Sequence, residues 1–166
     1  MKTFSPLKDI DSVTQILAKI SVWGGFTDER QEKIYKMLEV GTFKKGEYIF
    51  RKGDQPTHIY IIKSGRVDIF LSSEDVNIQK ETVEIGGCFG MAALMAMHPL
   101  MATALAAEDS EVMVLSRQAL LRLRYEDIEL FALLMMNIAR ELARRLKSSD
   151  NMLLNHVHGY KNHQLL

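Results

Sequence analysis

The sequence predicts an α+β fold in which a β-sandwich or roll is flanked by helices at both ends. Residues 41–116 consist of short runs of β-branched and aromatic residues, separated at intervals of about ten residues by turn sequences that contain glycine. Residues 1–40 and 117–155 instead carry apolar residues at helical spacing. With 166 residues, 47% hydrophobic and 25% charged, the chain has the size and composition of one globular domain.

The first forty residues are expected to form two helices. In the first, apolar residues recur at intervals of three and four, which places them on one helical face: Ile10, Val13, Ile16, Leu17 and Ile20. The second is expected to begin at Thr27, because Asp28 and Glu29 follow it and acidic side chains are favoured in the first turn of a helix.

Six short strands are expected between residues 41 and 116. They cover residues 47–50, 57–63, 66–71, 79–85, 101–107 and 110–115. In residues 66–71, apolar Val67, Ile69 and Leu71 alternate with the residues between them, as in a half-buried strand. Residues 91–97 (MAALMAM) interrupt the β pattern with strong helix formers, so we expect a short helix inserted there.

Residues 117–155 are expected to form two further helices, followed by a polar tail at residues 156–166. Ser116 is placed to cap the first, over residues 117–124, and Asp127 opens a long helix that runs to about Leu154. Glu141 and Arg145 form an i,i+4 pair that we expect on its outer face. The apolar stripe of this helix consists of Phe131, Met135, Ile138, Leu142, Leu146 and Leu153.

Glycines between strand-like runs give the middle of the chain a specific spacing. They occur in residues 43–54 (FKKGEYIFRKGD) and 59–70 (IYIIKSGRVDIF), and residues 87–90 (GCFG) precede the inserted helix. In these stretches, and in the order of its elements, the chain resembles the cyclic nucleotide-binding domain of the catabolite activator protein family and of the cAMP-dependent protein kinase regulatory subunit. The resemblance covers about residues 15–150. It implies a jelly-roll-like β-barrel, or double-stranded β-helix, flanked by N-terminal helices and a long C-terminal helix.

The resemblance also implies a ligand pocket at the family's phosphate-binding cassette. That cassette begins Phe-Gly-Glu, continues with a short helix and ends Pro-Arg-x-Ala-Thr/Ser; its Glu binds the ribose 2′-hydroxyl and its Arg pairs with the cyclic phosphate. Here the frame is kept, but Met91 stands at the Glu position and Leu100 at the Arg position. The candidate pocket residues are Phe89, Gly90, Met91, Ala92, Leu100, Met101, Ala102 and Thr103.

The change of these two anchors predicts that cAMP and cGMP do not bind. Removing one partner of a buried charge pair costs about 3–5 kcal/mol, and each ~1.4 kcal/mol is tenfold in affinity. Two states of the altered pocket remain open. Either the apolar side chains fill it and leave a ligand-free module, or it holds an apolar effector, an unusual nucleotide or haem.

Four other reactive side chains have simpler interpretations than functional ones. Cys88 is either a redox sensor or a small buried apolar residue, and the lack of a neighbouring basic residue favours burial. His98 is either a metal or haem ligand or a surface loop residue, and no second ligand stands at useful spacing. His156 and His158 are assigned to the polar tail. The sequence therefore indicates no metal site, no cofactor and no catalytic residue, and predicts that the protein is not an enzyme.

The long helix is expected to carry the interactions of the protein. A single roll does not cover an apolar stripe that continues to Leu153, and the matching helix of the catabolite activator family pairs with its twin. We therefore expect a homodimer through the stripe named above; the alternative is that the stripe packs on its own roll, at least to about Leu142. A basic cluster, either a solvated face or a surface for an acidic partner or nucleic acid, consists of Arg140, Arg144, Arg145 and Lys147.

Three functions agree with these features. The first is a non-catalytic regulatory module that acts by dimerisation and through an unidentified protein partner. The alternative is a small-molecule sensor that signals through the C-terminal helix, and a weaker third is a remnant of a DNA regulator. Because the formal net charge is zero and only about a dozen residues follow Leu154, we expect no DNA binding by the chain itself. One cysteine and a charged N-terminal segment favour a soluble, cytoplasmic protein without a membrane anchor.

Overall fold

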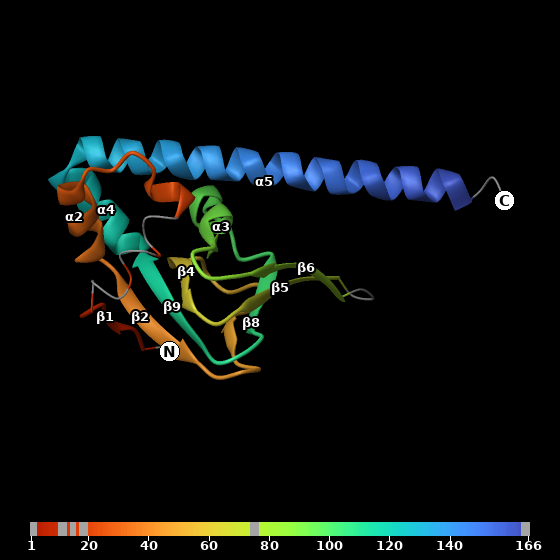
Figure 1. Ribbon diagram of the computed structural model, residues 1–166, viewed down its shortest axis with the longest axis horizontal. Coiled ribbons are helices and arrows are strands. Elements are labelled where there is room, and N and C mark those ends of the chain that lie inside the picture. The colour runs from red at the N-terminus through yellow and green to blue at the C-terminus, as the bar shows by residue number, and fades with distance from the viewer. Residues whose placement is uncertain (1–2, 10–12, 14–15, 17–19, 74–76, 164–166) are drawn as a thin grey trace.

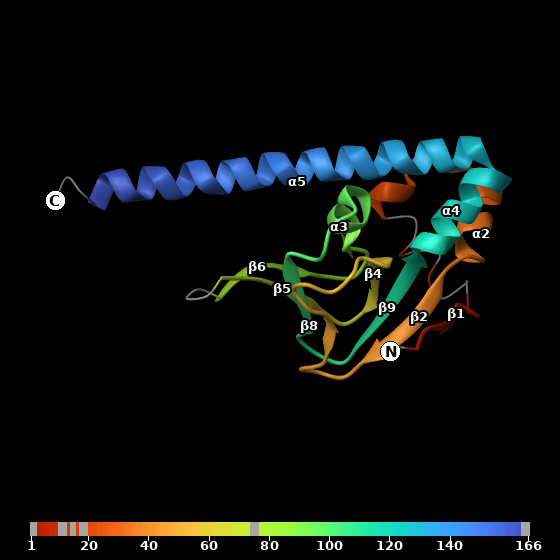
Figure 2. The same ribbon diagram turned by 180° about the vertical axis from the view of Figure 1, so that it is seen from behind.

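The computed structural model describes residues 3–9, 13, 16, 20–73 and 77–163, with side chains as far as residue 155. Two antiparallel sheets form a β-roll, and the longest helix crosses one end of it and extends beyond it (Figure 1; Figure 2). The expected α+β fold, a β-roll with helix before it and a long C-terminal helix after it, is confirmed.

Each sheet joins strands that are distant in the sequence. The first has the order β1 (Ser5–Pro6), β2 (Glu39–Phe43), β9 (Ser110–Ser116), β4 (His58–Ser64) and β7 (Cys88–Phe89). The second has the order β3 (Tyr48–Phe50), β8 (Ala102–Ala106), β5 (Val67–Ser72) and β6 (Asn77–Val83). Because β9 pairs with both β2 and β4, the last strand of the chain lies in the middle of the first sheet.

The helices begin close to the positions that the sequence predicts. They are η1 (Ser21–Trp23), α2 (Asp28–Tyr35), α3 (Met91–Ala96), α4 (Arg117–Glu126) and α5 (Ile128–His163). The hydroxyl of Thr27 accepts a hydrogen bond from the N–H of Arg30 at 3.4 Å, and that of Ser116 accepts from Ala119 at 3.1 Å. Both predicted caps are therefore confirmed. In space, α3 lies between the roll and α5 (Figure 1).

The sequence does not predict three of the strands. β1 and β7 are two residues long, and each depends on pairing with a distant strand, β2 and β4 respectively. In β2, Gly41 weakens the strand pattern. A Cβ there would lie 2.7 Å from the ring of Phe4, so the glycine lets the N-terminal segment pack against the strand. The helix expected over residues 10–20 falls largely outside the described residues.

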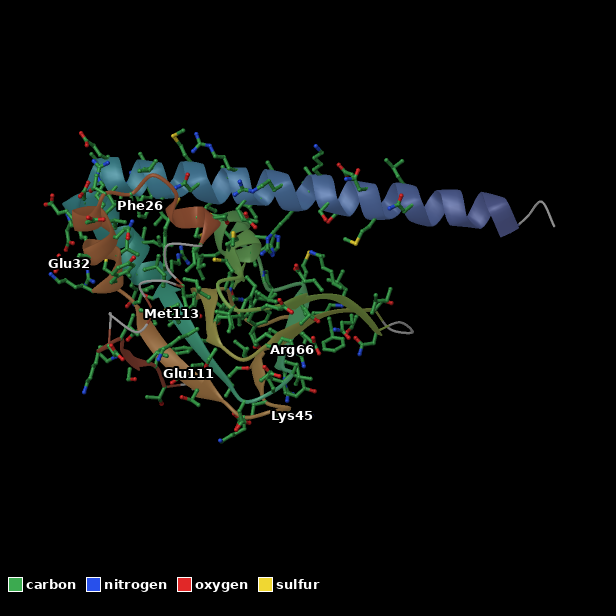
Figure 3. The ribbon with its side chains drawn as sticks, viewed as in Figure 1. Phe26, Glu32, Lys45, Arg66, Glu111 and Met113 are labelled. Atoms are coloured by element: carbon green, nitrogen blue, oxygen red, sulfur yellow. The ribbon has the colours of Figure 1, made fainter. Side chains whose placement is uncertain are left out.

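The core consists of two apolar clusters on opposite faces of the first sheet. Alternate residues of β9 belong to different clusters, because successive side chains of a strand point to opposite faces. Val112 and Val114 pack inside the roll, whereas Met113 and Leu115 pack against the helices, and all four are buried. Figure 3 shows Met113 between the strands and the helices. The first sheet is thus covered on both faces, which explains the unbroken apolar run of β9.

α5 is longer than the sequence predicts. It continues to His163, whereas the polar composition of residues 156–166 predicts a tail after about Leu154; that prediction is wrong. Once a helix is nucleated, each added residue costs little, so a helix continues past the end of its apolar stripe. The outer part of α5 extends beyond the roll (Figure 1). Of the stripe residues on the outer half of the helix, Leu146 is 64% exposed and Leu153 is 65% exposed.

A buried amide fixes the first half of α5 to the N-terminal segment. The side chain of Asn137 donates to the carbonyl oxygens of Val22 at 3.1 Å and of Gly24 at 2.9 Å. Ser21 adds a second contact, in which its hydroxyl donates to Glu141 at 2.8 Å. Because a buried polar group is costly unless it is hydrogen-bonded, these contacts determine where α5 crosses η1.

Replacing Asp127 tests the junction between α4 and α5. The carboxylate of Asp127 accepts from the N–H of Leu130 at 3.0 Å and pairs with Lys33 at 2.9 Å, and these contacts lower its pKa. We expect Asp127→Ala to lower the free energy of unfolding by about 1–2 kcal/mol, because the cap of α5 is lost. Asp127→Asn is the matched control with a smaller cost, since Asn also caps helices well. Urea unfolding measures both.

The same variants predict a pH dependence. A carboxyl whose pKa is lowered by folding stabilises the fold above its unfolded pKa, and the effect is lost as the pH falls through the folded pKa. The difference in stability between the wild type and Asp127→Ala should therefore narrow below about pH 4. A difference that stays constant down to about pH 2 would contradict the contribution of the charge.

Candidate functional site

A pocket of about 330 Å³ lies between the second sheet, the segment around α3 and the outer half of α5. Five strands (β3, β5, β6, β7 and β8) and two helices (α3 and α5) contribute to its wall, so the roll and the long helix enclose it together. Seven of the eight residues that the sequence proposes for the pocket line it: Phe89, Gly90, Met91, Ala92, Leu100, Met101 and Ala102. The structure thus brings these seven residues together around one hollow.

Thr103, the eighth candidate, lies outside this pocket. Its hydroxyl accepts a hydrogen bond from the N–H of Lys52 at 3.1 Å. It lines a separate hollow together with Tyr48 and Arg51. The alternation of β8 explains the difference, because Ala102 and Thr103 are neighbours in a strand and face opposite ways.

Stacked aromatic rings form the floor of the pocket. Phe50 and Phe89 both line it, with ring centroids 5.9 Å apart, and Tyr60 stacks on Phe89 at 5.2 Å. Gly90 has a φ of 81°, and a Cβ on it would lie 2.7 Å from the ring of Tyr60. The glycine is thus needed both for its left-handed backbone and for the close approach of the ring.

Met91 and Leu100 occupy the two positions where the resemblance places polar anchors. Met91 is 1% exposed and packs in the cluster between the first sheet and the helices, whereas Leu100 is 5% exposed and packs inside the roll. The main chain of Leu100 is fixed by hydrogen bonds to Gly53 and Asp54, at 2.8 and 2.9 Å. Neither side chain carries a strong donor or acceptor, so both positions offer a ligand apolar contact.

The charged side chains of the pocket come from β6 and α5, and sequence reasoning did not propose them as pocket residues. Lys80 and Glu81 lie on β6, and Arg145 and Ser149 lie on α5. No motif links two segments that stand more than sixty positions apart in the chain, so the sequence holds no local signal for them.

Arg145 ties α5 to the roll beside the pocket. Its guanidinium is 3.4 Å from the carboxylate of Glu81, donates to Glu141 at 3.1 Å and donates to the carbonyl oxygen of Cys88. The pairing of Glu141 with Arg145 is confirmed, but its expected place on the outer face is wrong. Both side chains are partly buried, because they face the roll.

Cys88 is buried, as the simpler interpretation expects, and His98 is exposed at the edge of the pocket. Cys88 is a free, buried thiol, and burial raises its pKa to about 12, although Arg145 acts in the opposite direction. His98 lies on the surface, with Nδ1 2.8 Å from the carbonyl oxygen of Pro99. Among the described residues, no group of three or more His, Cys, Asp or Glu side chains could hold a metal ion.

The six residues of the predicted helical stripe divide into two groups. Ile138 is 1% exposed, and Phe131, Met135 and Leu142 are partly buried against the cluster beneath α5. These four pack on their own chain, as the alternative interpretation allows. Leu146 and Leu153 remain exposed on the outer half of the helix. Within the described part of the chain, no helix is both long and apolar enough to cross a membrane.

Comparisons with known proteins agree on one family. A sequence profile described as "Cyclic nucleotide-binding domain" matches residues 40–127. The cAMP-dependent protein kinase regulatory subunit of Eremothecium gossypii is 34% identical over 116 residues, which are 70% of this chain and 24% of that protein. The Cyclic AMP receptor protein of Thermus thermophilus is 30% identical over 129 residues, which are 76% of this chain and 57% of that protein. The chain thus spans between a quarter and somewhat more than half of these relatives.

Solved structures share the fold. A cyclic nucleotide-binding domain from Methylobacillus flagellatus has a TM-score of 0.81 and 19% identity, and the match covers 93% of this chain and 87% of that chain. The catabolite activator protein of Thermus thermophilus has a TM-score of 0.72 and 27% identity, with 80% of this chain and 61% of that chain covered. The regulatory subunit of a cAMP-independent protein kinase A from Trypanosoma brucei has a TM-score of 0.67 and 20% identity, with 82% and 47% covered.

Thiol labelling tests the burial of Cys88. Because the thiolate is the reactive form and burial raises the pKa of Cys88 to about 12, we expect no reaction with a thiol-specific reagent at pH 8 in the folded protein. Unfolding in urea should expose one reactive thiol. Met97→Cys is the control, since Met97 is 62% exposed and a thiol there should react at once. Rapid labelling of the folded wild type would contradict the position of Cys88.

Proposed function

Since the chain belongs to the cyclic nucleotide-binding domain family, we propose that it is a non-catalytic regulatory module of that family which does not respond to cAMP or cGMP. It acts instead by dimerisation and through a protein partner. One observation carries this proposal. The side chains at the two anchor positions, Met91 and Leu100, are apolar and buried in the core.

The chemistry of a cyclic nucleotide explains why these two residues matter. Its phosphate brings a charge and its ribose brings a hydroxyl into a pocket whose floor is apolar and aromatic. An unpaired charge in such a place costs about 3–5 kcal/mol, which is roughly a thousandfold in affinity. Arg145 is the arginine that lines the pocket. Its guanidinium nitrogens already contact the carboxylates of Glu81 and Glu141 and the carbonyl oxygen of Cys88. No arginine that lines the pocket therefore replaces the missing phosphate partner without breaking the contact of α5 with the roll. Lys80, which has no ion-pair partner among the described residues, lies exposed at the rim of the pocket, where water weakens its attraction for a phosphate.

The relatives give the proposal a context. The names of the kinase regulatory subunit and of the receptor protein refer to cAMP, whereas the trypanosomal kinase that shares the fold is described as cAMP-independent. A member of this family that does not respond to cAMP is thus compatible with the fold. The buried single cysteine suits a reducing compartment, and we place the module in the cytoplasm.

An exposed heptad repeat on α5 supports the dimer. Seven positions spaced alternately by four and three residues all lie on the exposed side of the helix: Ala132, Met136, Ala139, Ala143, Leu146, Asp150 and Leu153. This spacing is that of a coiled-coil seam. We name these seven residues the α5 seam. It shares Leu146 and Leu153 with the stripe predicted from sequence, but it leaves out Ile138, which is buried in its own chain.

Charges beside the α5 seam favour a parallel pair of helices. Arg140 and Lys147 follow seam positions, whereas Met135 and Leu142 precede them on the other flank. In a parallel pair, each basic side chain faces an apolar flank of the partner and covers it with its aliphatic stem. In an antiparallel pair, the basic residues of one helix would instead face the basic residues of the other, and their like charges would repel. Asp150 is the one charged seam residue, and a polar core residue sets register at a cost in stability.

A second candidate function follows from the pocket itself. Although Met91 and Leu100 are buried, a hollow of about 330 Å³ remains beside them, within the size range of small-molecule sites. The module is then a sensor of a small molecule other than a cyclic nucleotide. Its signal passes through α5, because Arg145 and Leu146 line the hollow and belong to that helix.

Calorimetric titration with cAMP and cGMP tests the loss of nucleotide binding. We expect no saturable heat for the wild type up to millimolar nucleotide. Leu100→Arg returns a guanidinium to the pocket and should gain at least about tenfold in affinity for cAMP, as one restored charge pair allows. Leu100→Met is the apolar control and should give no saturable heat with either nucleotide. The melting temperature of each variant is measured first, to show that the variant is folded. Micromolar binding of cAMP by the wild type would contradict the proposal.

Sedimentation equilibrium tests the dimer and its seam. Leu153→Glu should weaken dimerisation at least about tenfold, because a seam leucine contributes about 1.5–3 kcal/mol when buried. Met152→Glu is the matched control, since Met152 is 50% exposed, lies next in sequence and points away from the seam. In the dimer, the Asp150 carboxylates of the two chains would face each other across the seam and repel. Asp150→Asn removes both charges and should therefore strengthen the dimer. A wild type that stays monomeric at high micromolar concentration would disprove the dimer.

A further inference from the structure

We propose that the pocket between the roll and α5 binds an apolar monocarboxylate, of which a medium-chain fatty acid is the simplest example. This inference rests on the second candidate function above, and on the absence of polar anchors for a nucleotide. Three properties of the pocket support it, namely its net charge, the apolar side chains that it leaves exposed and its size.

The charged groups around the pocket leave one positive charge without a partner. Arg145 pairs with Glu81 at 3.4 Å and with Glu141 at 3.1 Å, and Glu141 also pairs with Arg144 at 2.9 Å. Two guanidinium groups and two carboxylates thus neutralise each other. Lys80 also lines the pocket, and no ion-pair partner for it occurs among the described residues. The pocket therefore complements a ligand with a single negative charge.

Large apolar side chains of the pocket wall are exposed to solvent. Leu71 on β5 is 40% exposed, Met101 before β8 is 67% exposed and Leu146 on α5 is 64% exposed, and all three line the pocket. Exposed apolar surface that lines a concave site indicates a binding site for an apolar ligand. The α5 seam explains the exposure of Leu146, but Leu71 and Met101 lie outside that seam. A ligand with an apolar body accounts for these two side chains.

Composition and size set further limits on the ligand. Eleven of the seventeen residues that line the pocket have apolar side chains. The volume of about 330 Å³ lies at the small end of the range for small-molecule sites, about 300–1,000 Å³. An acid with an unbranched chain of moderate length meets both conditions. Its chain needs no hydrogen-bond partner, and its carboxylate lies at the rim, where Lys80 is exposed.

Isothermal calorimetry with decanoate, decanol and cAMP tests the proposal, with the full chain at pH 8 and each lipid well below micelle formation. We expect saturable binding of one decanoate per chain and no heat with cAMP. Decanol has the same apolar body without the charge, and it should bind about fivefold more weakly, as expected for one partly exposed ion pair.

Two pairs of variants locate the site. Lys80→Gln should abolish the preference for decanoate over decanol. Lys45→Gln is its control, since Lys45 lies at the end of the roll away from α5 (Figure 3). Met101→Glu places a carboxylate on the pocket wall and should weaken decanoate binding at least about tenfold. Met97→Glu is its control, because Met97 is 62% exposed and does not line the pocket.

The outcomes separate this inference from the proposed function. Absence of decanoate binding, equal affinity for decanoate and decanol, or equal affinity in the wild type and Met101→Glu would each overturn the monocarboxylate site. None of these results would affect the proposed loss of cAMP binding or the dimer, which the cAMP titration and sedimentation test separately. Saturable cAMP binding by the wild type would overturn the proposed function itself.

Discussion

The burial of β9 on both faces constrains the rest of this structure. Its alternating side chains connect the interior of the roll, through Val112 and Val114, to the layer of helices, through Met113 and Leu115. Because a shift of one residue would exchange these two sets, the register of β9 against β2 and β4 is determined by packing. The position of the helices follows from it, since α4 begins directly after β9 and α5 begins two residues after α4 ends.

Polar contacts then hold α5 across the roll as far as the pocket. Asp127 caps the helix, Asn137 ties it to the main chain near η1 and Arg145 ties it to β6 and β7. Leu146 follows at once and belongs both to the pocket wall and to the α5 seam. A ligand in the pocket and a partner on the seam would therefore touch the same residue, which gives the two proposed functions a common physical element.

The sequence predicts those features that depend on neighbouring residues, and it does not predict those that depend on distant ones. Alternation and turn glycines locate six strands, and the caps at Thr27 and Ser116 locate two helices. β1 and β7 exist only because a distant strand pairs with them, so their two-residue sequences carry no signal. The candidate pocket follows from the order of cassette residues, yet its charges come from β6 and α5. The helical stripe is recognisable, but the burial of Ile138 and the exposure of the residues beside it depend on how α5 lies on the roll.

The two apolar residues at the cassette positions also contribute to the packing of the fold itself. A glutamate and an arginine at these positions would be ionisable groups at the edge of an apolar core, and such groups are costly to bury when no ligand pairs with them. Met91 and Leu100 instead contribute apolar surface, and they do so to two different clusters, one beneath the helices and one inside the roll. Each buried side chain of this kind stabilises the fold by about 1.5–3 kcal/mol. Packing that holds β7, α3 and β8 together beneath α5 thus comes in part from these two side chains.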